Sequence, residues 1–156
     1  MNVGHEEKAI VPFYTAILLT LSLCLHSILE GLALGTDDDI ESSINIAVAI
    51  LAHKGMAAYA LGACVIDSNV SKQMFWSILG TFSMASPIGV MIGYAISEYS
   101  DSVTSSALSA LASGTFLYVA MMEVIPNELK SKKHKLEKLA ALLLGFGLMS
   151  MIAIWA

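Results

Sequence analysis

Long apolar stretches alternate with short polar segments along the chain. Each of five stretches is mostly apolar over about 20 residues, and the segments between them concentrate Asp, Glu, Lys, Asn and Ser. A helix of about 20 residues spans the roughly 30 Å hydrocarbon core of a bilayer. The pattern therefore predicts an all-α membrane protein, one transmembrane domain (1–156) of five transmembrane helices at about 9–35, 44–66, 74–97, 103–125 and 136–156.

Composition supports this class of protein. Hydrophobic residues make up 56% of the 156 residues and charged residues only 13%, about half the charged share of an ordinary soluble domain. The net charge of -5 and the small number of basic residues exclude a nucleic-acid-binding role. Cys24 and Cys64 both lie inside apolar stretches, so they are interpreted as small buried hydrophobes and not as a disulfide framework.

The lysines divide the loops into two sides. Because successive helices cross in opposite directions, one side collects seven lysines, and the other holds none but has six acidic residues. Cytoplasmic loops of membrane proteins carry the excess of basic residues. We therefore expect the N-terminus in the cytoplasm and the C-terminus outside. The seven orienting lysines are Lys8, Lys72, Lys130, Lys132, Lys133, Lys135 and Lys138.

Ionisable residues also occur at membrane depth, where they are costly and usually functional. His26 and Glu30 are four residues apart, on one face of the first helix. His26 lies nine residues before Gly35, and His53 lies nine residues after Ile44, so both are about 13–14 Å from the outer ends of their antiparallel helices. Imidazole and carboxylate ligands suit Zn²⁺. The spacing predicts a metal site of His26, Glu30 and His53 near the bilayer midplane.

Structural interpretations of the same residues remain open. A histidine inside a membrane helix often bonds only to a neighbouring helix. Glu30 could form an ion pair with Lys54, the eighth lysine, which lies inside the second apolar stretch. Ser27 is more often a serine bonded to its own helix than a ligand. Glu123, near the cytoplasmic end of the fourth stretch, could bind a departing metal or could pair structurally.

Three segments resemble the ZIP (Zrt/Irt-like) divalent metal transporter family. His26-Ser27-x-x-Glu30-Gly31 through Gly35 resembles its fourth transmembrane helix, and His53-Lys54-Gly55 through Gly62 resembles its fifth. The segment from Gly114-Thr115-Phe116 to Pro126 resembles its seventh. The resemblance implies a partial ZIP-type helix bundle matching family helices four to eight, in a protein that moves Zn²⁺, Fe²⁺, Mn²⁺ or Cd²⁺ into the cytoplasm as substrate, with no prosthetic group.

The sequence departs from the family pattern in two respects. Some relatives hold a second metal, and the matching positions here are Ser27, Lys54, Ala57 and Ser86. This resembles the His-Lys branch of the family, in which the Lys54 ammonium would take the place of the second metal and neutralise Glu30. The first three family helices are also missing. The expected partners are therefore divalent metal ions, the lipid bilayer, and either a second copy of the chain or a separate N-terminal three-helix part.

Other functions compete with transport. An intramembrane zinc hydrolase needs a general base beside the metal, and the His-Glu-x-x-His spacing of metalloproteases is absent from the sequence. A non-transporting fragment that modulates a full-length transporter is the other alternative. The leading hypothesis is a zinc transporter without enzymatic activity. The plasma membrane is its expected location, and an organellar membrane is the alternative.

Overall fold

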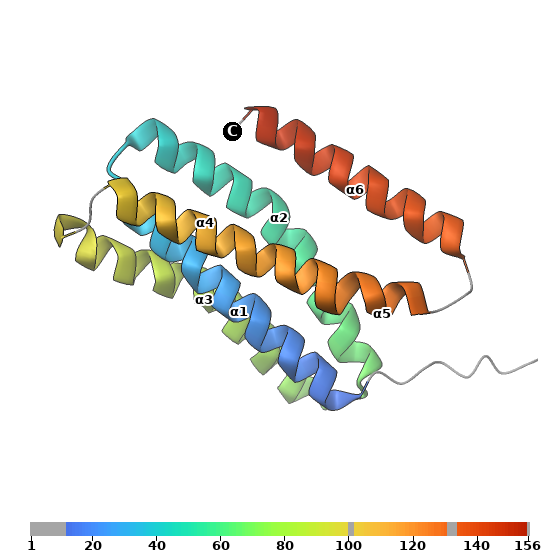
Figure 1. The fold of residues 1–156 in the computed structure, drawn as a ribbon. Helices are drawn as coiled ribbons and strands as arrows, with labels where there is room; N and C mark the ends of the chain where they lie inside the picture. The colour runs from blue at the N-terminus through green and yellow to red at the C-terminus, as the bar shows by residue number, and fades with distance from the viewer. Residues whose placement is uncertain (1–11, 100–101, 131–133, 156) are drawn as a thin grey trace, which may run out of the picture.

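The chain folds into antiparallel helices (Figure 1). The computed structural model describes residues 12–99, 102–130 and 134–155. Five of its helices are long and apolar enough to cross a membrane, which confirms the predicted all-α fold with five transmembrane helices. The helices are α1 (Phe13–Gly35), α2 (Ile40–Asp67), α3 (Lys72–Ile96), α4 (Ser102–Tyr118), α5 (Ile125–Lys130) and α6 (Lys135–Trp155). A 3₁₀ turn, Ser97–Tyr99, follows α3, and a π-helical segment, Val119–Val124, joins α4 to α5.

Two helices begin earlier than expected because polar side chains cap them. The Asp39 carboxylate accepts a hydrogen bond from the Ser42 amide, at 3.0 Å, so α2 begins at Ile40 and not near residue 44. The Ser71 hydroxyl accepts one from the Met74 amide, at 3.3 Å, and α3 begins at Lys72. Such caps satisfy backbone N–H groups that the first turn leaves unpaired. An apolar pattern cannot detect these polar first turns, so it places the starts too late.

The fourth apolar stretch does not stop at residue 125 as expected. The chain remains helical through Pro126 to Lys130. In the π-helical segment the Ile125 amide bonds to the Ala120 carbonyl, five residues back. Because Pro126 has no N–H to donate, this local change of register lets the helix continue past a residue that would otherwise break it.

Helix α1 is the centre of the bundle and packs against α2, α3 and α4. Its closest partner is α3, where two Gly-x-x-x-Gly motifs face each other. A Cβ atom added to Gly31 or Gly35 of α1 would overlap backbone atoms of α3, and one added to Gly89 or Gly93 of α3 would overlap carbonyl oxygens of α1. Small residues at this spacing let two membrane helices come into backbone contact.

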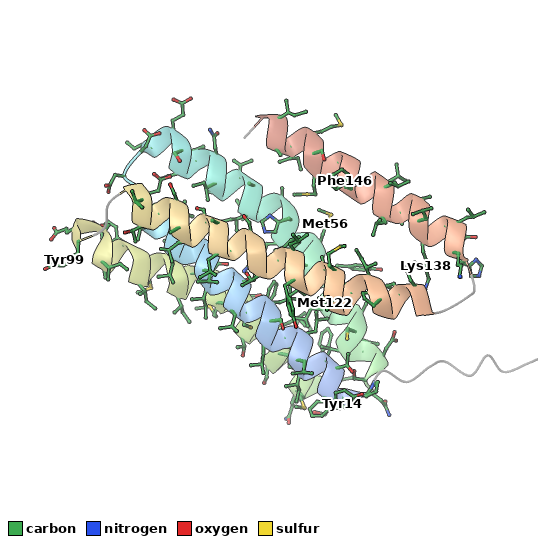
Figure 2. The ribbon with its side chains drawn as sticks, viewed as in Figure 1. Tyr14, Met56, Tyr99, Met122, Lys138 and Phe146 are labelled. Carbon is green, nitrogen blue, oxygen red and sulfur yellow. The ribbon has the colours of Figure 1, made fainter. Side chains whose placement is uncertain are left out.

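Most apolar side chains lie on the outside of the bundle. A small core of buried residues lies where α1, α2, α3 and the π-helical segment meet. Tyr14, Met122 and Phe146 are all more than 60% exposed, and their side chains project from the ribbon in Figure 2. Helix α6 makes few contacts, mainly with α2 and α5, and none of the residues in its apolar segment is buried. This distribution is expected of helices surrounded by lipid or by further helices, because apolar surface needs no burial there.

Candidate metal site

Three side chains from two helices meet beside α4. His26 and Glu30 lie one turn apart on α1, and His53 lies on α2. Glu30 Oε1 is 3.1 Å from His26 Nε2 and 2.7 Å from His53 Nε2. The structure therefore brings together the three residues that the sequence predicted for a metal site. One ligand atom from each of the three side chains lies within 4.8 Å of the other two, which is close enough for all three to hold one metal ion.

Backbone carbonyls orient both imidazoles. His53 Nδ1 is 2.6 Å from the Ala49 carbonyl oxygen in its own helix, and His26 Nδ1 is 2.9 Å from the Ala112 carbonyl oxygen in α4. A carbonyl oxygen only accepts hydrogen bonds, so each Nδ1 must carry the hydrogen and donate it. In the neutral imidazole the other nitrogen, Nε2, then has a free lone pair, which is the arrangement of a metal-ligating histidine.

The ligand atoms need a positive charge among them. Nε2 of His26 is buried, and although it lies 3.1 Å from Glu30 Oε1 it makes no hydrogen bond to any group in the described part of the chain. With both Nδ1 atoms donating to carbonyls, two imidazole lone pairs and a carboxylate oxygen face one another at close range. Acceptors packed in this way repel unless a proton or a metal cation lies between them. The chemistry of the three groups fits a divalent metal such as Zn²⁺.

Helix α4 supplies a wall of the site that the sequence analysis did not assign. The Phe116 ring packs against both imidazoles, with centroids 4.9 Å from His26 and 5.7 Å from His53. The Thr115 hydroxyl lies 3.4 Å from His26 Nδ1. Both residues belong to the segment that resembles the seventh family helix, so the motif was a usable signal. It did not indicate which side chains of α4 face the histidines.

Lys54 connects its own helix to two others. From α2 its ammonium donates to the hydroxyl of Ser27 in α1 at 3.3 Å. In α3 it donates to the Ser86 hydroxyl at 2.7 Å and to the Phe82 carbonyl oxygen at 3.4 Å, and it lies 4.5 Å above the centre of the Phe82 ring. Ser86 in turn donates to the Ser27 carbonyl oxygen at 3.1 Å. Three of the positions assigned to a second metal thus form one hydrogen-bonded cluster, the Lys54 cluster.

The remaining candidates lie apart from this arrangement or cannot be placed. Glu123 is part of the π-helical segment, but its side chain lies outside the described residues. Ala57 is half-buried against the apolar core. Cys24 and Cys64 are free and half-buried, also against that core.

Comparison with known proteins shows which family the chain matches. Over residues 3–153 the chain matches the family described as ZIP Zinc transporter. It is 35% identical to zinc transporter ZIP2 of Homo sapiens, over 98% of this chain and 51% of that protein. It is 39% identical to protein zntD of Dictyostelium discoideum, over 98% of this chain and 23% of that protein.

A third relative gives the same result. The chain is 34% identical to zinc transporter ZIP1 of Takifugu rubripes, over 97% of this chain and 51% of that protein. No solved structure matches the chain. The chain therefore spans about half the length, or less, of these curated relatives.

Proposed function

This chain belongs to the ZIP zinc transporter family, and from that premise we propose that it carries the metal site of a transporter that moves Zn²⁺ into the cytoplasm. His26, Glu30 and His53 are the proposed ligands. The observation that carries the proposal is the convergence of their three ligand atoms within 4.8 Å. Three protein ligands leave room for water in the coordination shell. A cation can therefore enter partly hydrated and leave again.

The metal is cargo, and Zn²⁺ is the proposed substrate. Two imidazoles and one carboxylate form a ligand set of borderline softness, which suits Zn²⁺ better than Mg²⁺ or Ca²⁺. Two of the relatives described above are named as zinc transporters. Fe²⁺, Mn²⁺ and Cd²⁺ accept the same nitrogen and oxygen ligands, and they are the alternative substrates. No prosthetic group has a part in the proposal.

We propose that Lys54 replaces a second metal ion. Its ammonium lies among Ser27, Ser86 and the Phe82 carbonyl, next in sequence to the ligand His53. A fixed positive charge there leaves no place for a second divalent cation, so one metal is transported at a time. Glu123 is proposed only as a residue of the exit path, from its position near the cytoplasmic end of α4.

The proposed orientation follows from the lysines. The end of the bundle that holds the α1–α2 loop is proposed to face outside, with the N-terminus in the cytoplasm and the plasma membrane as the location. Asp37, Asp38 and Asp39 in this loop would attract cations to the entrance. Cytoplasmic release then corresponds to the end that carries Lys72, Lys135 and Lys138.

The five helices are proposed as the metal-binding part of a larger assembly. The chain spans about half the length of its curated relatives, and α6 leaves its apolar surface uncovered. An N-terminal three-helix part or a second copy of this chain would complete the transport path. The hydrolase is not favoured, because the matched family is one of transporters, and because Glu30, which contacts both imidazoles, is proposed as a ligand and not as a general base.

Zinc uptake into proteoliposomes tests the proposal. Purified protein is reconstituted, and uptake of radioactive zinc is compared with that of His26→Ala and His134→Ala. His134 is an exposed histidine that pairs with Glu137 at 2.9 Å, far along the chain from the site, and is the matched control. We expect His26→Ala to abolish uptake and zinc binding, and His134→Ala to preserve both.

Other outcomes separate the competing functions. Zinc binding to the parent protein without uptake would support a part that needs its partner. Cleavage of a membrane peptide without zinc flux would support the hydrolase. Unchanged zinc binding by a folded His26→Ala protein would overturn the site assignment.

A further inference from the structure

We propose that Thr115 is a positioning residue that holds His26 in its metal-ligating form from across the interface between α1 and α4. The inference rests on the proposed function, because it assumes that His26 Nε2 binds the cation. It concerns the other nitrogen of the same ring, Nδ1, and the two oxygen atoms of α4 that surround it.

The two histidines are oriented by different parts of the molecule. His53 Nδ1 bonds to the Ala49 carbonyl, four residues earlier in α2, so its partner moves with its own helix. His26 Nδ1 bonds to the Ala112 carbonyl, which belongs to a different helix. The hydrogen bond at His26 Nδ1 therefore depends on how α4 lies against α1, whereas the bond at His53 Nδ1 lies within α2.

The Thr115 hydroxyl makes the surroundings of His26 Nδ1 purely accepting. Its Oγ1 lies 2.7 Å from the Ala112 carbonyl oxygen and donates its hydrogen there. The same oxygen lies 3.4 Å from His26 Nδ1 and can offer only a lone pair to it. With the carbonyl at 2.9 Å, both neighbours on α4 accept. An Nδ1 without a hydrogen would face two lone pairs, so the ring keeps its hydrogen on Nδ1 and its free lone pair on Nε2.

This arrangement links the position of α4 to the strength of metal binding. When α4 lies as in this structure, Nε2 of His26 lies 3.1 Å from Glu30 Oε1, and the ligand atoms of His26, Glu30 and His53 lie within 4.8 Å of one another. A displacement of α4 along α1 would remove both acceptors from Nδ1, and the ring could then rotate or exchange tautomers. Metal affinity would fall as a result, which provides a route for release.

Substitution of Thr115 by valine tests the inference, since valine keeps the shape of the side chain and removes the hydroxyl. Thr81→Val is the matched control, because Thr81 is exposed on α3 and its hydroxyl donates within its own helix, to the Ser77 carbonyl at 2.9 Å. Thr115→Ser restores the hydroxyl. Co²⁺ is titrated into each full-length variant in detergent, and its visible absorption reports both affinity and ligand geometry.

We expect Thr115→Val to bind Co²⁺ about tenfold more weakly, near the low end for loss of a ligand's supporting partner, because the Ala112 carbonyl remains. Its cobalt spectrum should also change, which a purely structural role would not require. Thr115→Ser and Thr81→Val should match the parent. Parent-like affinity and spectrum in Thr115→Val would overturn the inference and leave the proposed site intact. No Co²⁺ binding by the parent would overturn both.

A second measurement can overturn the inference even if Thr115→Val does not fold. Nitrogen NMR of the metal-free parent protein distinguishes the two tautomers of each histidine. The inference requires the hydrogen on Nδ1 of His26. A hydrogen on Nε2 of the neutral ring in the parent would overturn it.

Discussion

Lys54 brings a charge into the middle of the bundle, and its described hydrogen-bond partners are all neutral. They are the Ser27 and Ser86 hydroxyls and the Phe82 carbonyl. A charge at membrane depth costs about 2.5–3.5 kcal/mol on insertion scales. Hydrogen bonds to oxygen and the Phe82 ring offset part of this cost. Such a residue affects a nearby cation by repulsion as well as through the helices it connects.

Replacing Lys54 with methionine should separate these two effects. Methionine keeps an unbranched side chain of similar length but removes the charge. We expect Lys54→Met to retain Zn²⁺ binding, tighter than the parent by up to about tenfold, because a fixed positive charge next to His53 no longer repels the cation. Isothermal titration calorimetry of the purified protein measures the change.

The control for this variant is Lys72→Met, at the exposed first residue of α3, which should leave the affinity unchanged. If Lys54→Met bound no Zn²⁺ although it folded, the metal site would depend on the Lys54 side chain, and the proposal that Lys54 only replaces a second metal would be wrong.

Much of the site follows from the spacing of residues along the chain. The four-residue interval between His26 and Glu30 places them on one helical face. The equal distances that placed His53 at the same depth assumed a helix start at residue 44, whereas α2 begins at Ile40, yet His53 still reaches Glu30 at 2.7 Å. The partners of Lys54 do not follow in this way, since Glu30 contacts the two imidazoles instead. The hydrogen bond between His26 and the Ala112 carbonyl could not be predicted either, because every residue type has a backbone carbonyl.

At the scale of elements, α1 and α3 form the most closely packed pair of helices. The facing Gly-x-x-x-Gly motifs bring their backbones together, and the bond from Ser86 to the Ser27 carbonyl lies at the same interface. In a membrane, helices gain little from hiding apolar surface from one another, so close packing and hydrogen bonds carry their association. The pair holds the helix that bears His26 and Glu30 in a fixed position.

A single methyl group should test this packing. Gly93→Ala would place a Cβ against the Leu32 carbonyl, where the backbone of α1 cannot easily move away. We expect a loss of about 1–3 kcal/mol in stability, as for other overpacked sites. The thermal unfolding temperature of the protein in detergent, measured by size-exclusion chromatography after heating, should fall by several degrees.

The matched control is Gly80→Ala in the same helix, because a Cβ at Gly80 meets no atom within 4 Å. Alanine is the better helix former, so this variant should be as stable as the parent or slightly more so. Equal unfolding temperatures for Gly93→Ala and Gly80→Ala would contradict the close contact between α1 and α3.

The number and order of the helices could be predicted from apolar pattern, because each stretch had to cross about 30 Å of hydrocarbon. The partners of each helix could not. The histidines indicated that α1 and α2 meet, and His53 does contact Glu30. The closest packing of α1 is nevertheless with α3, whereas a Cβ atom added to Gly55 of α2 would meet no atom within 4 Å. The spacing of Gly89 and Gly93 indicates that α3 packs closely against some helix. It does not show which helix until the facing glycines of the partner are known.

At the scale of the whole molecule, the two ends of the bundle differ in charge. The α1–α2 loop and the end of α3 lie at one end in Figure 1, and the α2–α3 loop and the start of α6 lie at the other. Asp38 and Glu98 belong to the first end, and Lys72 and Lys135 to the second. The positive-inside rule then predicts that the end with the lysines faces the cytoplasm. The proposed direction of transport depends on that orientation.

Labelling of single cysteines in intact cells should establish this orientation. In a background with Cys24 and Cys64 replaced by alanine, cysteine is introduced at Asp38, Tyr99 or Lys135, all exposed. Asp38→Cys and Tyr99→Cys should react with a membrane-impermeant maleimide, and Lys135→Cys only after the cells are permeabilised.

Asp38 and Tyr99 lie in different loops, and both loops must be on the same side of the membrane if α2 and α3 each span the bilayer. Agreement between them therefore excludes an effect of one loop alone. The reverse pattern would place the acidic entrance in the cytoplasm and reverse the proposed direction of transport. Labelling of all three positions in intact cells would contradict an odd number of crossings between Asp38 and Lys135.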